Sequence, residues 1–337
     1  MPESLTKRRV DEATLNALIR AAFGADTRIA GYRELGDGYF NAAFRIELDD
    51  GRDVVLKASP PPDAALLTYE QDIMRGEAEF FRMAIESGVP QPQLLHADFD
   101  RKVIDGDFLV LSAVDGVTWS SMRADLGADE AAALSRELGA CMARLHTVRN
   151  PSGLFGYPAV PKLSAPTWPE AFAAMLGALI DDAEHYGVPL PVPAEDLRAV
   201  VDEQAGTLAE VTEPVLVHFD LWPGNILITD AGRIAALIDG ERMIWGDPLM
   251  EFIGADAFGR ADQDRELLAG YLAAGGRGTA AADDGAGRRL TLYRLYLQLL
   301  MLIEMTPRGY TDQGYLDHVN TEAPKRIVAA VAELTRR

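Results

Sequence analysis

The chain has 337 residues, of which 48% are hydrophobic and 25% charged, and these ordinary globular proportions argue against extended disorder. Its 32 Lys and Arg residues against 52 Asp and Glu residues give a net charge of −20, which argues against nucleic acid as a partner because a phosphate backbone attracts clustered positive charge. The only cysteine, Cys141, cannot form an intramolecular disulfide, and the polar segment Met1–Val10 resembles neither a secretory nor a transit signal; we therefore expect a cytoplasmic protein without nucleic-acid or membrane partners.

The first third of the sequence predicts one helix followed by an antiparallel sheet. Apolar residues at helical spacing indicate a helix over 11–23, and a strongly amphipathic pattern predicts a longer one over 67–86. Between and after them lie short β-like runs, and Asp49-Asp50-Gly51 is typical of a tight turn between antiparallel strands. The expected strands are 28–35, 42–48, 53–58, 93–99 and 108–111.

Beyond Gly116 the pattern is mainly helical, with one β-like island. Helices are expected at 129–147, 168–186, 194–211, 262–274, 288–305 and 315–335, and island strands at 214–217, 226–229 and 233–238. The segment Gly275–Gly287 is rich in Gly, Ala and Asp and predicts a solvated loop. The change near Ser112–Gly116 predicts two lobes, an N-terminal lobe over 1–113 and a C-terminal lobe over 114–337.

The segment Val217–Leu227 places an acidic residue and, five positions later, an amide in a Pro-Gly loop between two apolar strands. Phosphoryl transfer needs a carboxylate that orients the attacking hydroxyl and accepts its proton, and an oxygen ligand that holds Mg²⁺. Asp220 and Asn225 have the spacing of a kinase catalytic loop. Asp and Asn in loops commonly only cap turns, so the flanking sequence and a second carboxylate decide the interpretation.

That second carboxylate is Asp239, which ends the apolar run Ile234–Ile238 and precedes Gly240. A strand that ends in Asp-Gly is where a kinase places its main Mg²⁺ ligand, because the strand directs the carboxylate at the phosphate oxygens. An Asp-Gly hairpin turn is the alternative. Because Asn225 lies only fourteen residues earlier, we predict that Asn225 and Asp239 are the metal ligands and Asp220 the catalytic residue.

Taken together, His218–Leu227 and Ile238–Glu241 resemble the signature of the aminoglycoside phosphotransferase and choline kinase-like family, H-G-D-x-x-P-G-N followed by I-D-x-[ED]. The resemblance implies an α+β, bilobal protein-kinase-like fold with a β-rich N-lobe and a mainly helical C-lobe. It also implies Mg²⁺ as cofactor and ATP or GTP as phosphoryl donor. Two positions depart from the pattern: Phe219 stands where the family usually has a small residue, and Gly240 where an aromatic residue is common.

The resemblance also implies an ion pair that anchors the nucleotide. Lys57, inside the apolar run Val54–Lys57, corresponds to the lysine that holds the α- and β-phosphates. Its partner is expected on the next helix, where Glu77 matches best and Glu70 and Glu79 are alternatives.

Two further nucleotide-binding regions follow from the same resemblance. Backbone N–H groups of the turn at Gly36 and Gly38 would cover the phosphates, although the third glycine of a G-x-G-x-x-G loop is missing. Backbone groups near Ser112 and Val114 would meet the purine edge. The dipeptide Asp247-Pro248 resembles a family motif too, but an N-cap followed by a first-turn proline accounts for it.

Few residues separate Asp239-Gly240-Glu241 from Gly246-Asp247-Pro248, so the chain lacks the long activation segment of a protein kinase and a small acceptor is expected. The sequence therefore predicts a kinase that phosphorylates a hydroxyl group, and the acidic balance favours a cationic, aminoglycoside-like or other hydroxylated antibiotic. Kinases of choline-like, sugar or homoserine acceptors remain alternatives, as does an inactive nucleotide-binding regulator. Acidic residues of the C-terminal lobe, including Asp181, Asp182, Glu184 and Glu304, are candidates to meet the ammonium groups of a cationic acceptor, and the alternative is that they are surface charges.

Overall fold

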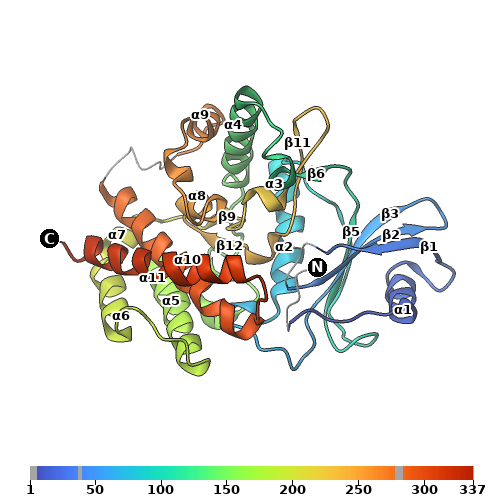
Figure 1. Ribbon diagram of the computed structural model, residues 1–337, viewed down its shortest axis with the longest axis horizontal. Helices are drawn as coiled ribbons and strands as arrows, with labels where there is room; N and C mark the ends of the chain where they lie inside the picture. The colour runs from blue at the N-terminus through green and yellow to red at the C-terminus, as the bar shows by residue number, and fades with distance from the viewer. Residues whose placement is uncertain (1–5, 37–39, 278–283, 337) are drawn as a thin grey trace.

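The computed structural model describes residues 6–36, 40–277 and 284–336. Its N-terminal part is an antiparallel sheet in the strand order β1-β2-β3-β5-β4, at the right of Figure 1. The β2–β3 turn includes Gly51 at a φ of 86°, as the Asp-Asp-Gly sequence predicted. The strands match the expected ranges closely: β1 Ile29–Glu34, β2 Ala42–Leu48, β3 Asp53–Ala58, β4 Leu94–Asp98 and β5 Phe108–Ser112.

The two faces of this sheet have different roles because successive side chains of a strand point to opposite faces. One face is covered by α1 (Glu12–Phe23), which lies on the outer side of the sheet in Figure 1. The apolar residues packed there include Leu15, Leu18 and Ile19 of α1 with Phe44, Ile46, Val54 and Leu56 of β2 and β3. Lys57, the next residue of β3, consequently points to the opposite face, toward the helical part of the molecule.

The predicted helix over 67–86 is wrong in its first third. The segment forms a 3₁₀ turn at Thr68–Glu70, then α2 at Ile73–Ala84 and a further 3₁₀ turn at Ile85–Ser87. Asp72 has a left-handed φ of 54°, which interrupts the helix and which Asp tolerates better than most residues. The remaining helix lies between the sheet and the helical part (Figure 1).

Two small antiparallel sheets in the helical part carry the loops of interest. One has the order β11-β10-β6, with β6 Val117–Thr118, β10 Ile226–Ile228 and β11 Ile234–Leu237. The other has the order β8-β7-β12-β9, with β7 Phe155–Gly156, β8 Ser164–Ala165, β9 Val215–Val217 and β12 Ile244–Gly246. Segment 218–225 joins β9 to β10 and segment 238–243 joins β11 to β12, so both loops run between the same two sheets. The sequence predicted β9, β10 and β11 as short apolar runs. It did not predict β6, β7, β8 and β12, which have two or three residues each.

Helices surround these sheets: α3 Trp119–Met122, α4 Ala128–Leu145, α5 Trp168–His185, α6 Ala194–Glu203, α7 Ala205–Leu208, α8 Leu249–Ala255, α9 Arg265–Ala273, α10 Asp284–Arg308 and α11 Gln313–Leu334. The helix expected over 194–211 is divided at Gln204, whose side chain donates to the carbonyl of Leu334 at 3.2 Å. The first turn of α10 lies in the segment assigned to a loop, because Ala286 is fully buried against the core. Within the described ranges, the model contains no helix with the length and hydrophobicity needed to cross a membrane.

Candidate active site

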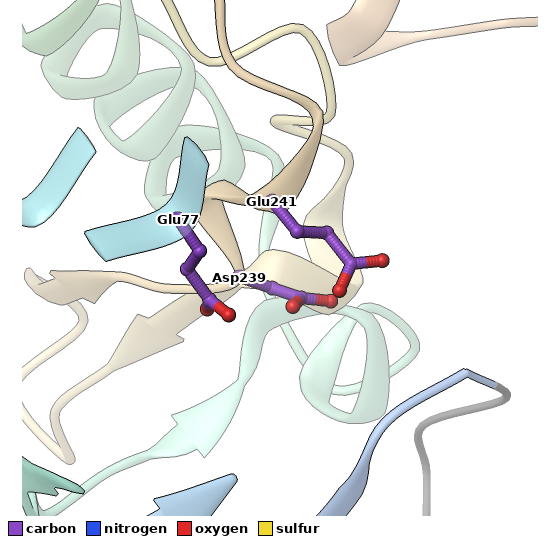
Figure 2. Close-up of side chains that lie close together, drawn as sticks. All are labelled: Glu77, Asp239 and Glu241. Carbon is purple, nitrogen blue, oxygen red and sulfur yellow. The ribbon is translucent and has the colours of Figure 1, made fainter. Parts of the chain in front are cut away.

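Lys57 lies among carboxylates where the sheet meets the helical part. Its Nζ is 2.6 Å from Glu77 Oε1 and 2.5 Å from Asp239 Oδ1, and it is 4.0 Å from Glu241 Oε2. Glu77 comes from α2, whereas Asp239 and Glu241 come from the segment after β11. Figure 2 shows these three acidic side chains reaching toward one region, and their ligand oxygens lie within 4.8 Å of one another. The structure thus brings together the predicted lysine, its predicted partner and the predicted metal ligand.

The two alternative partners of Lys57 have other contacts. Glu70, at the end of the 3₁₀ turn before α2, forms a buried ion pair with Arg308. Glu79 accepts a hydrogen bond from Trp245 Nε1 at 2.8 Å. Of the three glutamates considered, Glu77 is therefore the one that faces the lysine.

One positive charge thus faces three acidic groups. Burial alone would lower the pKa of Lys57, but the charges of Asp239, Glu77 and Glu241 raise it above its ordinary value, so the ammonium group stays charged. Burial raises the pKa of Glu77 to about 7 and that of Glu241 well above its usual value. Burial also opposes ionisation of Asp239, yet Lys57 lowers the pKa of this carboxyl. Three carboxyl groups thus share one ammonium group, and a bound cation would favour the ionised forms of Glu77 and Glu241.

The loop 218–225 holds Asp220 and Asn225 together. Asn225 Nδ2 donates to the carbonyl of Asp220 at 2.9 Å and to its Oδ2 at 3.1 Å. The backbone N–H of Ile238 donates to the carbonyl of Asn225 at 3.0 Å, so this loop is bonded to the residue next to Asp239. The Asp220 side chain is 24% exposed, and burial raises the pKa of its carboxyl while Arg242 opposes that rise.

His218 and Glu251 hold the loop 218–225 in place through hydrogen bonds. His218 Nε2 donates to the carbonyl of Ile238 at 2.9 Å, and its Nδ1 accepts from the N–H of Asp220 at 3.3 Å, which assigns the ring proton to Nε2. The carboxylate of Glu251, on α8, accepts the N–H groups of His218 and Phe219 at 2.9 Å each. The ring of His218 therefore holds the loop to the segment before Asp239. The sequence had not singled out Glu251.

Replacing Glu251 by Ala is expected to lower the free energy of unfolding by about 3 kcal/mol, because two buried N–H groups lose their acceptor. Glu251 is fully buried, so water does not readily replace the carboxylate. Urea unfolding measures the change, and Glu86→Ala, at an exposed glutamate, is the matched control. Equal unfolding midpoints for both variants would contradict this role of Glu251.

The two departures from the family signature have structural explanations. Phe219 has a left-handed φ of 63°, a conformation in which glycine is unstrained, and its ring is buried 6.0 Å from that of Tyr296. At Gly240 a Cβ atom would come within 2.3 Å of the Phe80 ring. Phe80, from α2, therefore fills the space beside Gly240 and stacks edge-on against His218 at 4.9 Å. The aromatic ring beside position 240 therefore comes from α2 and not from residue 240 itself.

The predicted nucleotide-covering turn is described only in part. Gly36 follows β1, whereas Gly38 lies outside the described residues. On the far side of the turn, Asn41 is buried and its Nδ2 donates to Glu241 Oε2 at 2.6 Å. Sequence reasoning did not single out this asparagine, because its partner lies 200 positions away in the chain.

The predicted purine-binding segment begins where β5 ends. Ser112 pairs with Gln93 through its N–H at 2.8 Å and through its Oγ, which accepts from the Gln93 N–H at 2.9 Å. Two residues later, the N–H of Val114 makes no hydrogen bond within the described part of the chain. A donor is thus available to a ligand at Val114, whereas the N–H of Ser112 is already paired.

Arg242, which sequence reasoning also missed, lies beside the loop. Its Nε is 4.0 Å from Asp220 Oδ2, and its guanidinium is 2.9 Å from Glu304 on α10. Glu304 is also 3.5 Å from Arg308. The expectation that Glu304 meets a substrate ammonium group is therefore corrected, because this buried carboxylate faces two arginines of the protein. No local pattern marked Arg242, which directly follows Asp239-Gly240-Glu241 in the sequence.

Of the other three acidic residues, Asp182 is buried, whereas Asp181 and Glu184 are exposed. Asp182 accepts from the N–H and the Oγ1 of Thr68 at 2.8 Å each, and Asp181 pairs with Arg198 at 2.7 Å. Glu184 is exposed on α5. The structure does not gather these residues around Asp220.

Asp247 does more than begin a helix. Its Oδ1 accepts from the N–H of Leu249, the first residue of α8, at 3.0 Å. Its Oδ2 accepts from Arg289 Nε at 2.9 Å and from the hydroxyl of Tyr293 at 2.7 Å. Capping alone is therefore an incomplete explanation, since this buried carboxylate also joins α8 to α10.

Comparison with known proteins adds independent findings. The model of the phosphotransferase enzyme family (APH) matches residues 31–287. A search of the curated proteins found no match.

Solved structures resemble the chain over nearly its whole length. A thermostable mutant of the aminoglycoside phosphotransferase APH(4)-Ia, in a ternary complex with ADP and hygromycin B, is 21% identical with a TM-score of 0.62, covering 96% of this chain and 100% of that one. A putative fructosamine-3-kinase from Thermobifida fusca is 20% identical with a TM-score of 0.64, covering 95% and 100%. The APH(2")-IIa structure with streptomycin and ATP is 15% identical with a TM-score of 0.59, covering 95% and 99%. These likenesses confirm the predicted protein-kinase-like fold.

Proposed function

The chain belongs to the phosphotransferase enzyme family, and from that membership we propose that it transfers the γ-phosphoryl group of ATP or GTP to a hydroxyl group of a small molecule. The observation that carries this proposal is the position of Lys57 Nζ, which lies within 2.6 Å of both Glu77 and Asp239. A buried lysine held between two carboxylates is the arrangement that anchors nucleotide phosphates in kinases. The proposed lobes are residues 1–113 and 114–337, with the nucleotide between them.

In the proposed reaction, Asp220 is the catalytic residue. Its carboxylate orients the acceptor hydroxyl and takes its proton as the oxygen bonds to the γ-phosphorus and the bond to the β-phosphate oxygen breaks. Lys57, paired with Glu77, holds the α- and β-phosphates. Backbone groups at Gly36 and Gly38 cover the phosphates, and those near Ser112 and Val114 meet the purine.

The donor set fits Mg²⁺, which prefers carboxylate and amide oxygens. Asp239 would hold the ion together with Asn225, and Glu241 offers a further oxygen within the same group of ligands. Asp239 is 35% exposed, so its carboxylate is open to an incoming ion in a way that the fully buried Glu77 is not. A bound Mg²⁺ would supply positive charge to the phosphate oxygens.

For the acceptor we propose an aminoglycoside-like or other hydroxylated antibiotic. Support comes from the net charge of −20, which attracts cationic ligands, and from the short segment between Asp239 and β12, which leaves no platform for a peptide. The similar structures bound to hygromycin B and to streptomycin agree with such an acceptor.

One observation favours a second class of acceptor. Asp182 and Glu304, the buried acidic residues expected to meet ammonium groups, are bonded to Thr68 and to Arg242 instead. A less cationic metabolite, such as a sugar or an amino alcohol, fits that arrangement better than a polycation. The similar putative fructosamine-3-kinase agrees with this alternative.

An acceptor screen separates the two classes. The protein is incubated with Mg²⁺ and either ATP or GTP, against one panel of hydroxylated antibiotics and one of sugars and amino alcohols. Mass spectrometry is expected to detect a product heavier by one phosphoryl group in the antibiotic panel. Products confined to neutral sugars would overturn the antibiotic proposal while keeping the kinase, and nucleotide binding without any product would favour a regulator.

A further inference from the structure

Asn41 joins the beginning of the sheet to the metal-binding segment. It immediately precedes β2 and is 5% exposed. Its Nδ2 donates to Glu241 Oε2 at 2.6 Å in a buried contact between residues 200 positions apart. Glu241 in turn belongs to the group of acidic ligands with Glu77 and Asp239 and lies 4.0 Å from Lys57. The contact therefore connects the strand after the β1–β2 turn directly to the site of the phosphates.

The other amide atom of Asn41 points to a ligand. Its Oδ1 is buried and makes no hydrogen bond within the described part of the chain, which is uncommon for a polar atom in a folded protein. The opposite orientation of the amide would place Oδ1 against the carboxylate oxygen of Glu241, so the Nδ2 contact is the favourable one. An amide oxygen accepts hydrogen bonds, so its missing partner carries an O–H or N–H group. Water held by the triphosphate or its cation has that chemistry.

We propose that Asn41 and Glu241 form a clasp that holds the beginning of β2 against the segment of Asp239. Asn41 is thus a positioning residue for the phosphates of the nucleotide, and its Oδ1 receives a water molecule bound to them. The clasp rests on the proposed function, because it needs a nucleoside triphosphate between β1–β2 and Asp239.

The test exchanges the donor and the acceptor of the hydrogen bond between Asn41 and Glu241. Asn41→Asp places two carboxylates in contact, whereas Asn41→Asp combined with Glu241→Gln restores one donor and one acceptor without changing the net charge. Dissociation constants for ATP with Mg²⁺ and for adenosine are measured by calorimetry, with Asn16→Asp as the control, since Asn16 on α1 bonds only to the carbonyl of Glu12 in its own helix. Thermal unfolding establishes that each variant is folded.

Asn41→Asp is expected to weaken the binding of ATP with Mg²⁺ by about tenfold or more. The binding of adenosine is expected to weaken by less than about twofold, because adenosine has no phosphates for the clasp to position. The double variant is expected to recover to within about threefold of the wild type. A single variant that binds like the wild type, or a double variant no better than the single one, would overturn the clasp alone. A wild-type protein that binds neither ATP nor GTP would overturn the proposed function together with the clasp.

Discussion

Replacing Asp220 by Asn is expected to lower the turnover number for phosphoryl transfer by about 10³-fold, because the acceptor hydroxyl loses the group proposed to take its proton. The Asp220 side chain is 24% exposed, accepts a hydrogen bond from Asn225 and lies 4.0 Å from Arg242 Nε. Asn preserves the shape of the side chain and keeps one acceptor oxygen for Asn225 Nδ2. Binding of ATP and folding are therefore expected to change little.

Steady-state kinetics with the acceptor found in the screen, together with calorimetric titration of ATP, separate these effects. Asp230→Asn is the matched control, since Asp230 is exposed in the turn between β10 and β11. Turnover by the Asp220 variant at the wild-type rate would show that another group accepts the proton, and the assignment of Asp220 would be wrong.

Replacing Asp239 by Ala is expected to remove nearly all of the Mg²⁺-dependent part of nucleotide affinity, about 10²-fold or more, because the proposed main oxygen ligand of the ion is lost. Lys57 keeps its contact with Glu77 at 2.6 Å, so the fold of the site does not depend on Asp239 alone. Chelation of Mg²⁺ by EDTA is expected to weaken ATP binding to the wild type and to leave the Asp239 variant unchanged.

Calorimetric titration of ATP with Mg²⁺ or with EDTA measures this dependence. Glu241→Ala is the comparison variant, and its loss is expected to be smaller than that of Asp239→Ala. If Glu241→Ala abolished the Mg²⁺ dependence while Asp239→Ala preserved it, the main ligand would be Glu241.

The residues that the sequence predicted well are those whose local pattern encodes their position. Asp220 and Asn225 were recognisable because a Pro-Gly loop separates two apolar strands there. Lys57 was recognisable because the family resemblance places a lysine in the apolar run Val54–Lys57. In β3 its neighbours Leu56 and Ala58 pack toward α1, so the lysine points to the opposite face. Periodicity of this kind also predicted most long helices and the five-stranded sheet.

Other residues of the candidate site had no such local pattern, because their positions depend on contacts with residues far away in the sequence. Asn41, Phe80 and Glu251 reach the site from a turn, from α2 and from α8, and each acts on a residue far away in the sequence. No local rule separates Glu251, which accepts two buried N–H groups, from a solvated glutamate. The break of the helix at Asp72 is similar, since its left-handed φ of 54° accompanies contacts with Arg101 in another part of the N-terminal region.

The acceptor was the least predictable property, and the structure shows why. Charge alone suggested that acidic side chains would meet a cationic substrate, yet burial decides whether such charges are available. Glu304 and Asp182 are 2% and 7% exposed and bonded within the protein. Both carboxylates contribute to the net charge, but in the fold they bind Arg242 and Thr68 and are not available to a substrate.

The most direct test of the central claim, that this chain is an active phosphotransferase using Asp220, follows the label of ATP radiolabelled in its γ-phosphate. The wild type and Asp220→Asn are mixed with Mg²⁺, labelled ATP and the combined acceptor panels, and the products are separated. The account predicts label in a small acceptor with the wild type and almost none with the variant, although both bind ATP. Label transferred equally by both proteins, or ATP bound by the wild type without transfer to any acceptor, would contradict it.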